Sequence, residues 1–412
     1  MKKLSELTDR LQPDLLCGTM EKEISAVVYD SRKITEGCLF IAIRGANFDG
    51  HSAIPQAIEK KAAAVLAEGI DTDMLRNCAE AGITVVRTEN TRYGLGLVAA
   101  AWFGYPAAKL QTIGITGTKG KTTTTYLIKS MLENAGVKCG LIGTIEVDNG
   151  KERIPAVNTT PESYLVQEYF AQMVENGCRA VVMEVSSQAL MMHRVAGITY
   201  DIGVFTNLSP DHIGPNEHKD FDDYLHCKSL LFQRCKKGIF NCDDKHFEDI
   251  LKGHTCEVET FGFDPKADFN ARNMEFIRGI GYLGVNYNVK GLENFHVEIK
   301  VPGRFSVYNS LTAIAICHHF GVSQEAMVRA LREAKVKGRI EMIHVSDEFA
   351  LMIDYAHNAM ALESLLNSIK DYVPERLVCV FGCGGNRSKL RRYEMGEVSG
   401  RLADLTIITS DK

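Results

Sequence analysis

The sequence predicts an α/β protein of three domains. The chain of 412 residues is longer than most single domains and large enough to bury a sizeable core. Short apolar runs alternate with segments of helical periodicity along most of its length, and this alternation indicates a largely parallel sheet covered by helices on both faces. Changes in the pattern near Pro106 and Gly338 predict domains at residues 1–109, 110–337 and 338–412.

In the first domain, four apolar runs are typical of strands and two periodic segments are typical of helices. The expected strands are residues 24–29, 38–43, 62–67 and 83–87, and the expected helices are 52–60 and 91–103. Pro106 and the polar residues after it form a linker to the next domain.

In the central domain, strands and helices again alternate, which predicts a doubly wound parallel sheet. The expected strands are 110–115, 178–184, 202–206 and 238–241, and the expected helices are 122–135, 162–176, 307–320 and 324–334. Between residues 256 and 301 the apolar runs are short and broken by glycine. This change indicates an antiparallel appendix to the sheet.

The third domain shows the same α/β alternation over a shorter length. Strands are expected at 349–355, 377–381 and 405–409, and helices at 361–372 and 392–402. Because the chain stops at Lys412, directly after a strand, we expect a truncated, Rossmann-like α/β domain with an incomplete sheet.

Composition and charge argue against nucleic-acid and membrane partners. The net charge of −5 provides no general positive surface for nucleic acid or an anionic membrane. No apolar run approaches the roughly 20 residues of a membrane span. The N-terminal segment MKKLSELTDRL lacks the apolar core of a signal peptide. We therefore expect a cytoplasmic protein.

The twelve cysteines are expected to be reduced thiols. They are scattered through predicted strands and helices, and no Cys-x-x-Cys pair occurs. A zinc cluster drawn from six irregularly spaced residues is not expected. These six are Cys227, Cys235, Cys242, His246, His254 and Cys256.

The most informative segment is GITGTKGKTTTT, residues 114–125. It follows a predicted strand and opens a predicted helix; its glycines let the backbone fold around a phosphate chain, and a helix N-terminus favours anions. Lys121 adds a positive charge and Thr122 offers a hydroxyl to Mg²⁺. The usual phosphate loop has glycine five residues before Gly120, where this chain has isoleucine, so the loop is a variant, GTKGKTT. The structural alternative is a plain glycine-rich turn; we expect a nucleoside triphosphate site.

Three polar clusters follow other apolar segments of the same predicted sheet. Glu184 ends one strand, Asn207, Asp211 and His212 follow another, and Lys228 lies in a helical segment. Each has a structural alternative: a surface charge at a strand end, a helix cap, a turn histidine or a solvated helix position. Because ligands gather at the carboxyl ends of such strands, their coincidence with the phosphate loop favours a functional cluster.

Two further segments could bind a substrate. NTTPE, residues 158–162, serves either as a helix start or as part of a binding site. Ser186, Ser187 and Arg194 follow Glu184, and two hydroxyls with a guanidinium suit recognition of carboxylate or phosphate.

These motifs occur together in one known family. The segments GTKGKTT, NTTPE, MEVSSQAL with HR after it, FTNLSPDH, YLHCKSLLF, VPGRFSVYN, KGRIEMI, DYAH and FGCGGNRSK follow one another in this order. Together they resemble the Mur ligases, and among these the ligases that add the third amino acid to the UDP-N-acetylmuramoyl-dipeptide of peptidoglycan. YDSRKITEGCLFIAIRGANFDGH, beginning at Tyr29, is similar to the UDP-substrate domain of that family. The resemblance covers the chain from about Tyr29 onward.

The resemblance implies a role for each matching position. Residues expected at ATP are Gly117, Thr118, Lys119, Gly120, Lys121, Thr122, Thr123, Asn309, Arg339 and Asp354. Residues expected at the UDP-linked substrate are Ser31, Asn158, Thr159, Thr160, Ser186 and Arg194. Residues expected at magnesium are Thr122, Glu184, His212 and Lys228, the last as a carbamate. Catalytic roles are implied for Lys121, His212 and Lys228.

The implied reaction is ATP-driven amide formation. The D-Glu side-chain carboxylate of the substrate would attack the γ-phosphorus of ATP, giving an acyl phosphate and ADP. The amino group of L-lysine or meso-diaminopimelate would then attack the activated carbonyl, and phosphate would leave. The implied cofactors are ATP, Mg²⁺ and a CO₂-derived carbamate on Lys228, which requires a neutral amine first. The expected partners are these small molecules, and we expect a monomer.

Some positions depart from the pattern of the family. They are Gln188, Met192, Ser306, Ala359, Asn386 and Ser388. The motif that selects the incoming amino acid would follow Asp411, so the acceptor pocket is expected to be mostly missing. Three alternatives stay open: a related ligase acting on folate, cyanophycin or another peptide carboxylate, a nucleotide-binding pseudo-ligase or truncated inactive homologue, and a switch-type GTPase, for which no clear guanine-reading motif is present.

Overall fold

A computed structural model describes the whole chain except residues 46–47, 215–216, 335, 337, 384–388 and 411–412. The chain forms two compact units, each described here by itself. The first unit comprises Met1–Thr118, Val137–Gly238 and Glu248–Val258. The second comprises Lys119–Gly136, Ile239–Phe247 and Glu259–Lys412. Asn386 and Ser388 of the predicted FGCGGNRSK motif lie outside the described residues.

The N-terminal part of the first unit is a five-stranded sheet with the order β2-β7-β6-β5-β4. Its strands are β2 (Asp14–Cys17), β4 (Val27–Val28), β5 (Leu39–Ile41), β6 (Ala64–Ala67) and β7 (Thr84–Arg87). All neighbours pair in parallel except β2, which is antiparallel to β7. Two short strands, β1 (Lys2–Lys3) and β3 (Glu23–Ile24), pair separately.

Four helices accompany this sheet, and apolar side chains of the strands alternate between two buried clusters. The helices are α1 (Leu4–Thr8), α2 (Ile54–Glu59), α3 (Thr72–Glu80) and α4 (Thr91–Trp102). Helix α4 begins where the side chain of Asn90 accepts a hydrogen bond from the Tyr93 amide at 3.0 Å, a standard N-cap. The helix α3 was not predicted from the sequence.

The central part of the first unit is a parallel-rich sheet with the order β11-β10-β9-β12-β8-β13-β14. Its strands are β8 (Gln111–Thr116), β9 (Cys139–Ile142), β10 (Glu146–Asp148), β11 (Arg153–Pro155), β12 (Ala180–Glu184), β13 (Tyr200–Phe205) and β14 (Cys235–Asn241), whose last residues belong to the second unit. Strands β9, β12, β8 and β13 are parallel, and β10 and β11 form an antiparallel edge. The continuous apolar runs of β8 and β12 are buried on both faces, as expected of a covered parallel sheet.

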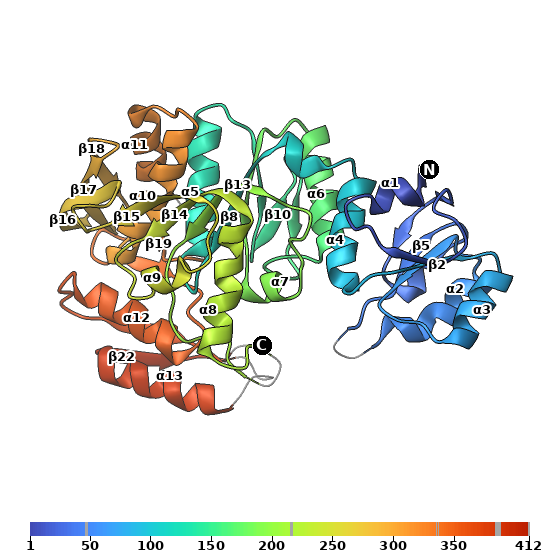
Figure 1. Cartoon of the computed structure of the whole chain (residues 1–412). Coiled ribbons are helices and arrows are strands. Elements are labelled where there is room, and N and C mark those ends of the chain that lie inside the picture. Colours follow the sequence, from blue (N-terminus) through green and yellow to red (C-terminus); the bar gives the residue numbers. More distant parts are fainter. Residues whose placement is uncertain (46–47, 215–216, 335, 337, 384–388, 411–412) are drawn as a thin grey trace. The chain divides into compact units, whose positions relative to one another are not determined.

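Three helices of this part carry or border predicted site residues: α6 (Ser163–Glu175), α7 (Ser187–Met191) and α8 (Phe221–Ser229). Helix α8 is capped by Asp220, whose carboxylate accepts a hydrogen bond from the amide of Asp223 at 2.8 Å. Helix α4 packs against α6, and α7 packs against α8 (Figure 1).

The second unit contains helices α5 (Lys121–Asn134), α10 (Arg304–His319) and α11 (Gln324–Glu333), of which α10 and α11 both pack against α5. It also contains a β-rich segment with the order β15-β16-β17-β18. The strands are β15 (Glu257–Gly262), β16 (Phe269–Gly279), β17 (Tyr282–Gly291) and β18 (Phe295–Ile299), and a short helix α9 (Phe247–Ile250) precedes them. The predicted antiparallel appendix is confirmed for β16, β17 and β18; β15 instead pairs in parallel with β16.

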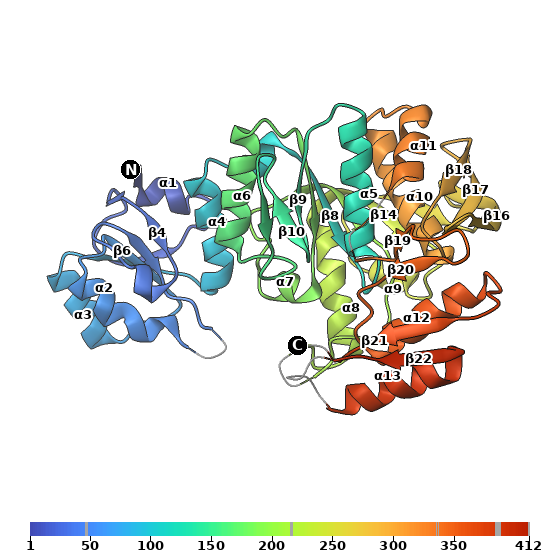
Figure 2. The same cartoon turned by 180° about the vertical axis from the view of Figure 1, so that it is seen from behind.

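The C-terminal part of the second unit has two small sheets. Strands β19 (Glu341–Ile343) and β20 (Leu351–Ile353) are antiparallel, and β21 (Val378–Phe381) and β22 (Leu405–Ile408) are parallel. Helices α12 (Ala359–Lys370) and α13 (Lys389–Leu402) pack together beside β21 and β22, around a small core that includes Leu366 and Met395 (Figure 2).

The predicted α/β class with a parallel-rich sheet is confirmed. All twelve cysteines are free thiols. Among the described helices, none has the length and apolar character needed to cross a membrane.

Candidate active site

The phosphate loop directly follows β8 and needs glycine at two positions. Gly117 has φ of 147°, and a Cβ at this position would lie 1.9 Å from Oγ1 of Thr206. Gly120 has φ of 87° and precedes the first residue of α5, Lys121. A side chain at either position would strain or displace the backbone, so the variant loop keeps its glycines for a steric reason.

Within the first unit, Thr118 ties this loop to the segment that follows β13. The Thr118 amide donates to the carbonyl oxygen of Asn207 at 2.9 Å. Its hydroxyl donates to the carbonyl oxygen of Ser209 at 3.2 Å and lies 3.1 Å from the Tyr224 hydroxyl on α8. The predicted neighbourhood of the loop and the Asn207 segment is therefore present in the structure.

Lys228 is buried beside the loop, with only 1% of its surface exposed. Its ammonium donates to the carbonyl oxygen of Gly117 at 2.9 Å. It also lies 4.6 Å from the centre of the Tyr224 ring, a cation–π distance. The structural alternative of a solvated helix position is wrong for this lysine, because the helix α8 turns it toward the protein interior.

Tyr224 was not predicted as a site residue, although it contacts both Thr118 and Lys228. Burial raises the pKa of its hydroxyl, so the group stays protonated and can donate. Tyr224 precedes Lys228 by four residues, and residues four apart share one face of a helix. This spacing is the signal that could have identified it.

Glu184 ends β12 and is also buried, with 1% exposed. Its two carboxylate oxygens accept hydrogen bonds from the amide and the hydroxyl of Thr144, at 2.8 and 3.0 Å. Gly143 leaves room for this carboxylate, since a Cβ there would lie 2.6 Å from the Glu184 oxygen. Thr144 follows β9 as Glu184 follows β12, so the strand-end argument could have found it.

The NTTPE segment and the residues after Glu184 form one hydrogen-bonded group. The Thr160 hydroxyl donates to the Glu184 carbonyl oxygen at 2.8 Å and accepts from the Ser186 amide at 3.1 Å. The Arg194 guanidinium donates to the Thr160 carbonyl oxygen at 3.3 Å. The Thr159 hydroxyl lies 3.1 Å from that of Thr144. Asn158 is exposed.

Glu162 links this group to the N-terminal part of the same unit. Its carboxylate accepts from Arg92 of α4 at 3.2 Å and lies 3.9 Å from Arg194. Ser31 begins a 3₁₀ helix (Ser31–Lys33). The preceding strand leads to Tyr29, whose ring centre lies 5.7 Å from that of Tyr164 on α6, and burial raises the pKa of the Tyr29 hydroxyl to about 12.

His212 adopts a left-handed backbone conformation, with φ of 55°. Its side chain is 53% exposed, and Nδ1 lies 3.0 Å from Oε1 of Glu217 in the same loop. The structure therefore pairs this predicted magnesium ligand with a nearby carboxylate.

The other predicted ATP-binding residues belong to the second unit. Thr122 is buried at the start of α5, and the hydroxyl of Thr124 donates to Oδ1 of Asn309 on α10 at 3.2 Å. Lys119 is exposed, while Lys121 and Thr123 are half-buried. The two helices thus bring Asn309 next to the helix that carries Lys121.

Arg339 and Asp354 also lie in the second unit. The Arg339 guanidinium is 4.6 Å from the centre of the Tyr355 ring. The Asp354 carboxylate accepts from the amides of Ile340 at 2.9 Å and Ala356 at 2.8 Å, so it fixes the loop after β20.

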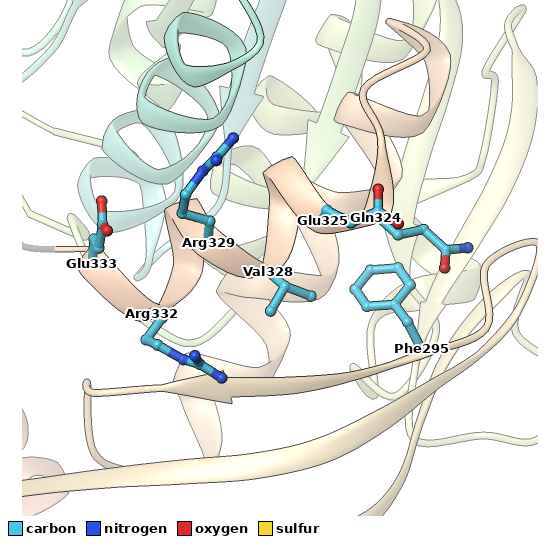
Figure 3. Close-up of a pocket in the computed structure, with 7 residues that line it drawn as sticks. All are labelled: Phe295, Gln324, Glu325, Val328, Arg329, Arg332 and Glu333. Carbon is cyan, nitrogen blue, oxygen red and sulfur yellow. The ribbon is translucent and has the colours of Figure 1, made fainter.

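A pocket of about 510 Å³ lies beside α11 and β18 in the second unit (Figure 3). It contains two arginines and two glutamates, and none of its residues was predicted as a site residue. The lining residues are Phe295, Gln324, Glu325, Val328, Arg329, Arg332 and Glu333.

Three protein families match successive segments of the chain. The Mur ligase family catalytic domain matches residues 23–102, and the Mur ligase middle domain matches residues 115–317. The glutamate ligase domain of the Mur ligases matches residues 338–412.

Individual relatives align over nearly the whole chain. The UDP-N-acetylmuramoyl-L-alanyl-D-glutamate–2,6-diaminopimelate ligase 1 of Clostridium acetobutylicum is 40% identical over 412 residues, which cover 99% of this chain and 83% of the relative. The corresponding ligase of Clostridium perfringens is 37% identical over 415 residues, with the same two coverages. A solved structure of a UDP-N-acetylmuramoyl-L-alanyl-D-glutamate–2,6-diaminopimelate ligase superposes with a TM-score of 0.77 at 25% identity, and covers 100% of this chain and 82% of that one.

These alignments do not support the expected truncation of the third domain, because they take in 99% of this chain. They agree with the three family matches and with the order of motifs along the sequence. The chain belongs to the Mur ligase family.

Proposed function

We propose that this protein is an ATP-dependent ligase of peptidoglycan precursor synthesis that joins 2,6-diaminopimelate to UDP-N-acetylmuramoyl-L-Ala-D-Glu. The D-Glu side-chain carboxyl would be activated as an acyl phosphate and captured by an amino group of the diamino acid. Relatives that are 35–40% identical over at least 95% of the chain carry this activity in their names.

The observation that carries the proposal is the contact between Lys228 and Gly117. It places a buried cation on the backbone of the glycine-rich loop, at the carboxyl end of β8. A parallel sheet binds its ligands at this edge, and a solvated helix would not hold a lysine there. The contact therefore supports an active site at the loop.

The residues present fit ATP and magnesium. Gly117 and Gly120 have backbone conformations that suit a phosphate-binding turn, and α5 begins directly after them. Glu184 and Thr122 provide a carboxylate and a hydroxyl, which are ligands that Mg²⁺ prefers. ATP would supply the phosphoryl group, and magnesium would neutralise charge on it.

The side chains of the protein would then divide the remaining tasks. Lys121 would bind the phosphates and offset the charge that develops during transfer. Thr144 would hold the Glu184 carboxylate in one orientation through two hydrogen bonds. Asn309, Arg339 and Asp354 would complete the nucleotide site from the second unit.

Lys228 is proposed to act as a carbamate. The neutral amine would attack CO₂, forming an N–C bond and releasing one proton, and the product would present anionic oxygens near the loop. The buried position beside the Gly117 carbonyl supports this role, because it holds the nitrogen away from bulk water. Its CO₂-derived group and the role of His212 as a magnesium ligand stay proposals.

The group around Thr160 is proposed to bind the UDP-linked dipeptide. Ser186 and Arg194 are held by Thr160, which is itself tied to the backbone of Glu184. This arrangement would connect the substrate site to the metal site by a few hydrogen bonds. Ser31, Asn158 and Thr159 are assigned to the same site by the family pattern alone. A cytoplasmic location and a monomeric state stay predictions from the sequence.

The test is direct. The full chain is incubated with ATP, Mg²⁺, UDP-N-acetylmuramoyl-L-Ala-D-Glu and either meso-diaminopimelate or L-lysine, and the product is identified by mass. We expect a tripeptide product with meso-diaminopimelate and ADP release that depends on both substrates. Binding of ATP and of the UDP-linked dipeptide without any amide product would instead favour a pseudo-ligase. Product formation with folate in place of the UDP-linked dipeptide would change the substrate assignment.

A further inference from the structure

A buried histidine outside the predicted site, His218, joins three segments of the first unit. The exposed fraction of its side chain is 0%. Its Nε2 lies 2.8 Å from the hydroxyl of Ser187, the first residue of α7, and its Nδ1 lies 2.9 Å from Oδ2 of Asp223 in α8. Both ring nitrogens are therefore engaged.

The polarity of this group can be assigned. The hydrogen bond from His218 lowers the pKa of the Asp223 carboxyl, so Asp223 is ionised and only accepts. Nδ1 of His218 consequently carries the proton and donates to Asp223. In the neutral imidazole, Nε2 then accepts from the Ser187 hydroxyl.

The order Ser187–His218–Asp223 matches the hydrogen-bond order of a hydrolytic triad, yet burial argues against that chemistry. Ser187 is 3% exposed and His218 is fully buried, so no substrate carbonyl can reach the serine oxygen. The group must act on the protein itself.

The backbone of His218 shows where it acts. Its amide donates to the carbonyl oxygen of His212 at 3.0 Å, and its own carbonyl oxygen accepts from the amide of Gly214 at 3.1 Å. His212 is held between these contacts at φ of 55°, a conformation that costs a non-glycine residue roughly 1 kcal/mol or more. Such a conformation persists only where the surroundings impose it.

We propose that His218 is the positioning residue for His212. The ring of His218, fixed by Ser187 and Asp223, holds the backbone that keeps His212 in its left-handed conformation and so aims the His212 imidazole for metal binding. The same ring links the segment after Glu184 to the helix that carries Lys228. This inference rests on the proposed function in that it takes His212 as a magnesium ligand.

The neighbouring thiol does not change this assignment. Cys227 Sγ lies 4.0 Å from Oδ1 of Asp223, and burial raises its pKa to about 11, so it stays a thiol. His218, Asp223 and Cys227 are close enough to be considered as a metal group among the described residues, but both ring nitrogens of His218 already have protein partners.

The test measures Mn²⁺ binding to the full chain in the presence of a non-hydrolysable ATP analogue, by electron paramagnetic resonance. We expect Ser187→Ala and His218→Gln to weaken Mn²⁺ binding roughly tenfold, as other supporting residues of metal ligands do. His226→Gln, which changes an exposed histidine of the same helix, is the matched control and should bind Mn²⁺ like the wild type. Ser187→Thr, which keeps the hydroxyl, should restore most of the affinity lost in Ser187→Ala.

A double-mutant cycle separates positioning from a general loss of structure. In a His212→Ala background, His218→Gln should weaken Mn²⁺ binding no further, because the ligand it positions is gone. An equal, additive loss in that background would overturn the proposal, as would unchanged Mn²⁺ affinity in both Ser187→Ala and His218→Gln with intact circular dichroism. Stoichiometric zinc in the purified protein that is lost in Cys227→Ser would also overturn it, since the cluster would then be a metal site. Because these readouts need no amide product, they remain distinct from the failure of the proposed reaction.

Discussion

The Lys228 ammonium donates a 2.9 Å hydrogen bond to the carbonyl oxygen of Gly117, which lies 111 residues earlier in the chain. This contact joins helix α8 to the glycine-rich loop and buries a lysine almost completely. A buried cation is costly unless it is paired or used chemically. Its position beside the loop is the basis for the first prediction.

Lys228→Ala is expected to reduce turnover roughly 100-fold, because it removes the group proposed to become an anionic carbamate. Concentrated bicarbonate or chloride should restore part of the activity by placing an anion in the vacated space. Steady-state kinetics with and without these salts measure the effect. Lys252→Ala, a change at an exposed lysine, serves as the control, and wild-type activity in Lys228→Ala would remove the carbamate from the mechanism.

Lys121→Ala is expected to lower turnover by roughly 100-fold or more, because the phosphates lose the cation at the start of α5. The tripeptide assay measures the rate, with Lys109→Ala as a control at an exposed lysine before β8. Retained ATP-dependent ligation in Lys121→Ala would refute the assignment of the loop.

Thr144→Val is expected to raise the Mg²⁺ concentration for half-maximal activity roughly tenfold. The substitution removes the hydroxyl that donates to Glu184 at 3.0 Å and keeps the amide bond at 2.8 Å. A hydrogen bond to a charged group contributes about 1.5–3 kcal/mol. Magnesium titrations of activity provide the measurement, and Thr144→Ser, which keeps the hydroxyl, should behave like the wild type. Equal titration curves for both variants would show that the hydroxyl does not orient Glu184.

Gly117→Ala is expected to abolish nucleotide binding and to lower the melting temperature. A Cβ at this position would lie 1.9 Å from Thr206 Oγ1, and φ of 147° is unfavourable for alanine. Calorimetric titration with ATP and thermal unfolding report the two effects. Gly69→Ala meets no atom within 4 Å and should change neither; normal ATP affinity in Gly117→Ala would mean that the loop is not the site.

Tyr372→Phe is expected to lower the free energy of unfolding by about 1–3 kcal/mol. The Tyr372 hydroxyl donates to the Gly284 carbonyl oxygen at 2.7 Å and accepts from the Gly303 amide at 3.0 Å, and the residue is only 2% exposed. Phenylalanine would leave both backbone groups without this partner in a buried site. Denaturant unfolding measures the change against Tyr393→Phe, a substitution at a ring that is 74% exposed, and equal stability of the two variants would contradict the expectation.

Much of the secondary structure could be predicted because it is written in local patterns. The run before Gly117 and the periodic segment after Lys121 became β8 and α5 with shifts of one residue at each end. Helix α3 was missed because its polar sequence TDMLRNCAE buries only Cys78, so it shows little of the apolar pattern on which the prediction relies. The parallel pairing of β15 with β16 was also missed, since pairing direction depends on how the chain returns to the sheet.

The candidate site was partly predictable for the same reason. Glu184 could be singled out because it ends an apolar run, and ligands bind at the carboxyl ends of parallel strands. Thr144 and Tyr224 received no role, because what matters about them is contact with Glu184, Thr118 and Lys228. Such contacts join segments that are distant in sequence and leave no local pattern.

The sequence by itself determined the glycine loop, the order of strands and helices and the resemblance to the Mur ligases, since each depends on neighbouring residues or on motif order. Only the tertiary structure decided that Lys228 is buried on the Gly117 carbonyl, that Glu184 is held by Thr144 and that His218 fixes the backbone of His212. The physical reason is that burial and hydrogen-bond partners arise when separate strands and helices pack together, and residues 6 to 111 positions apart become neighbours.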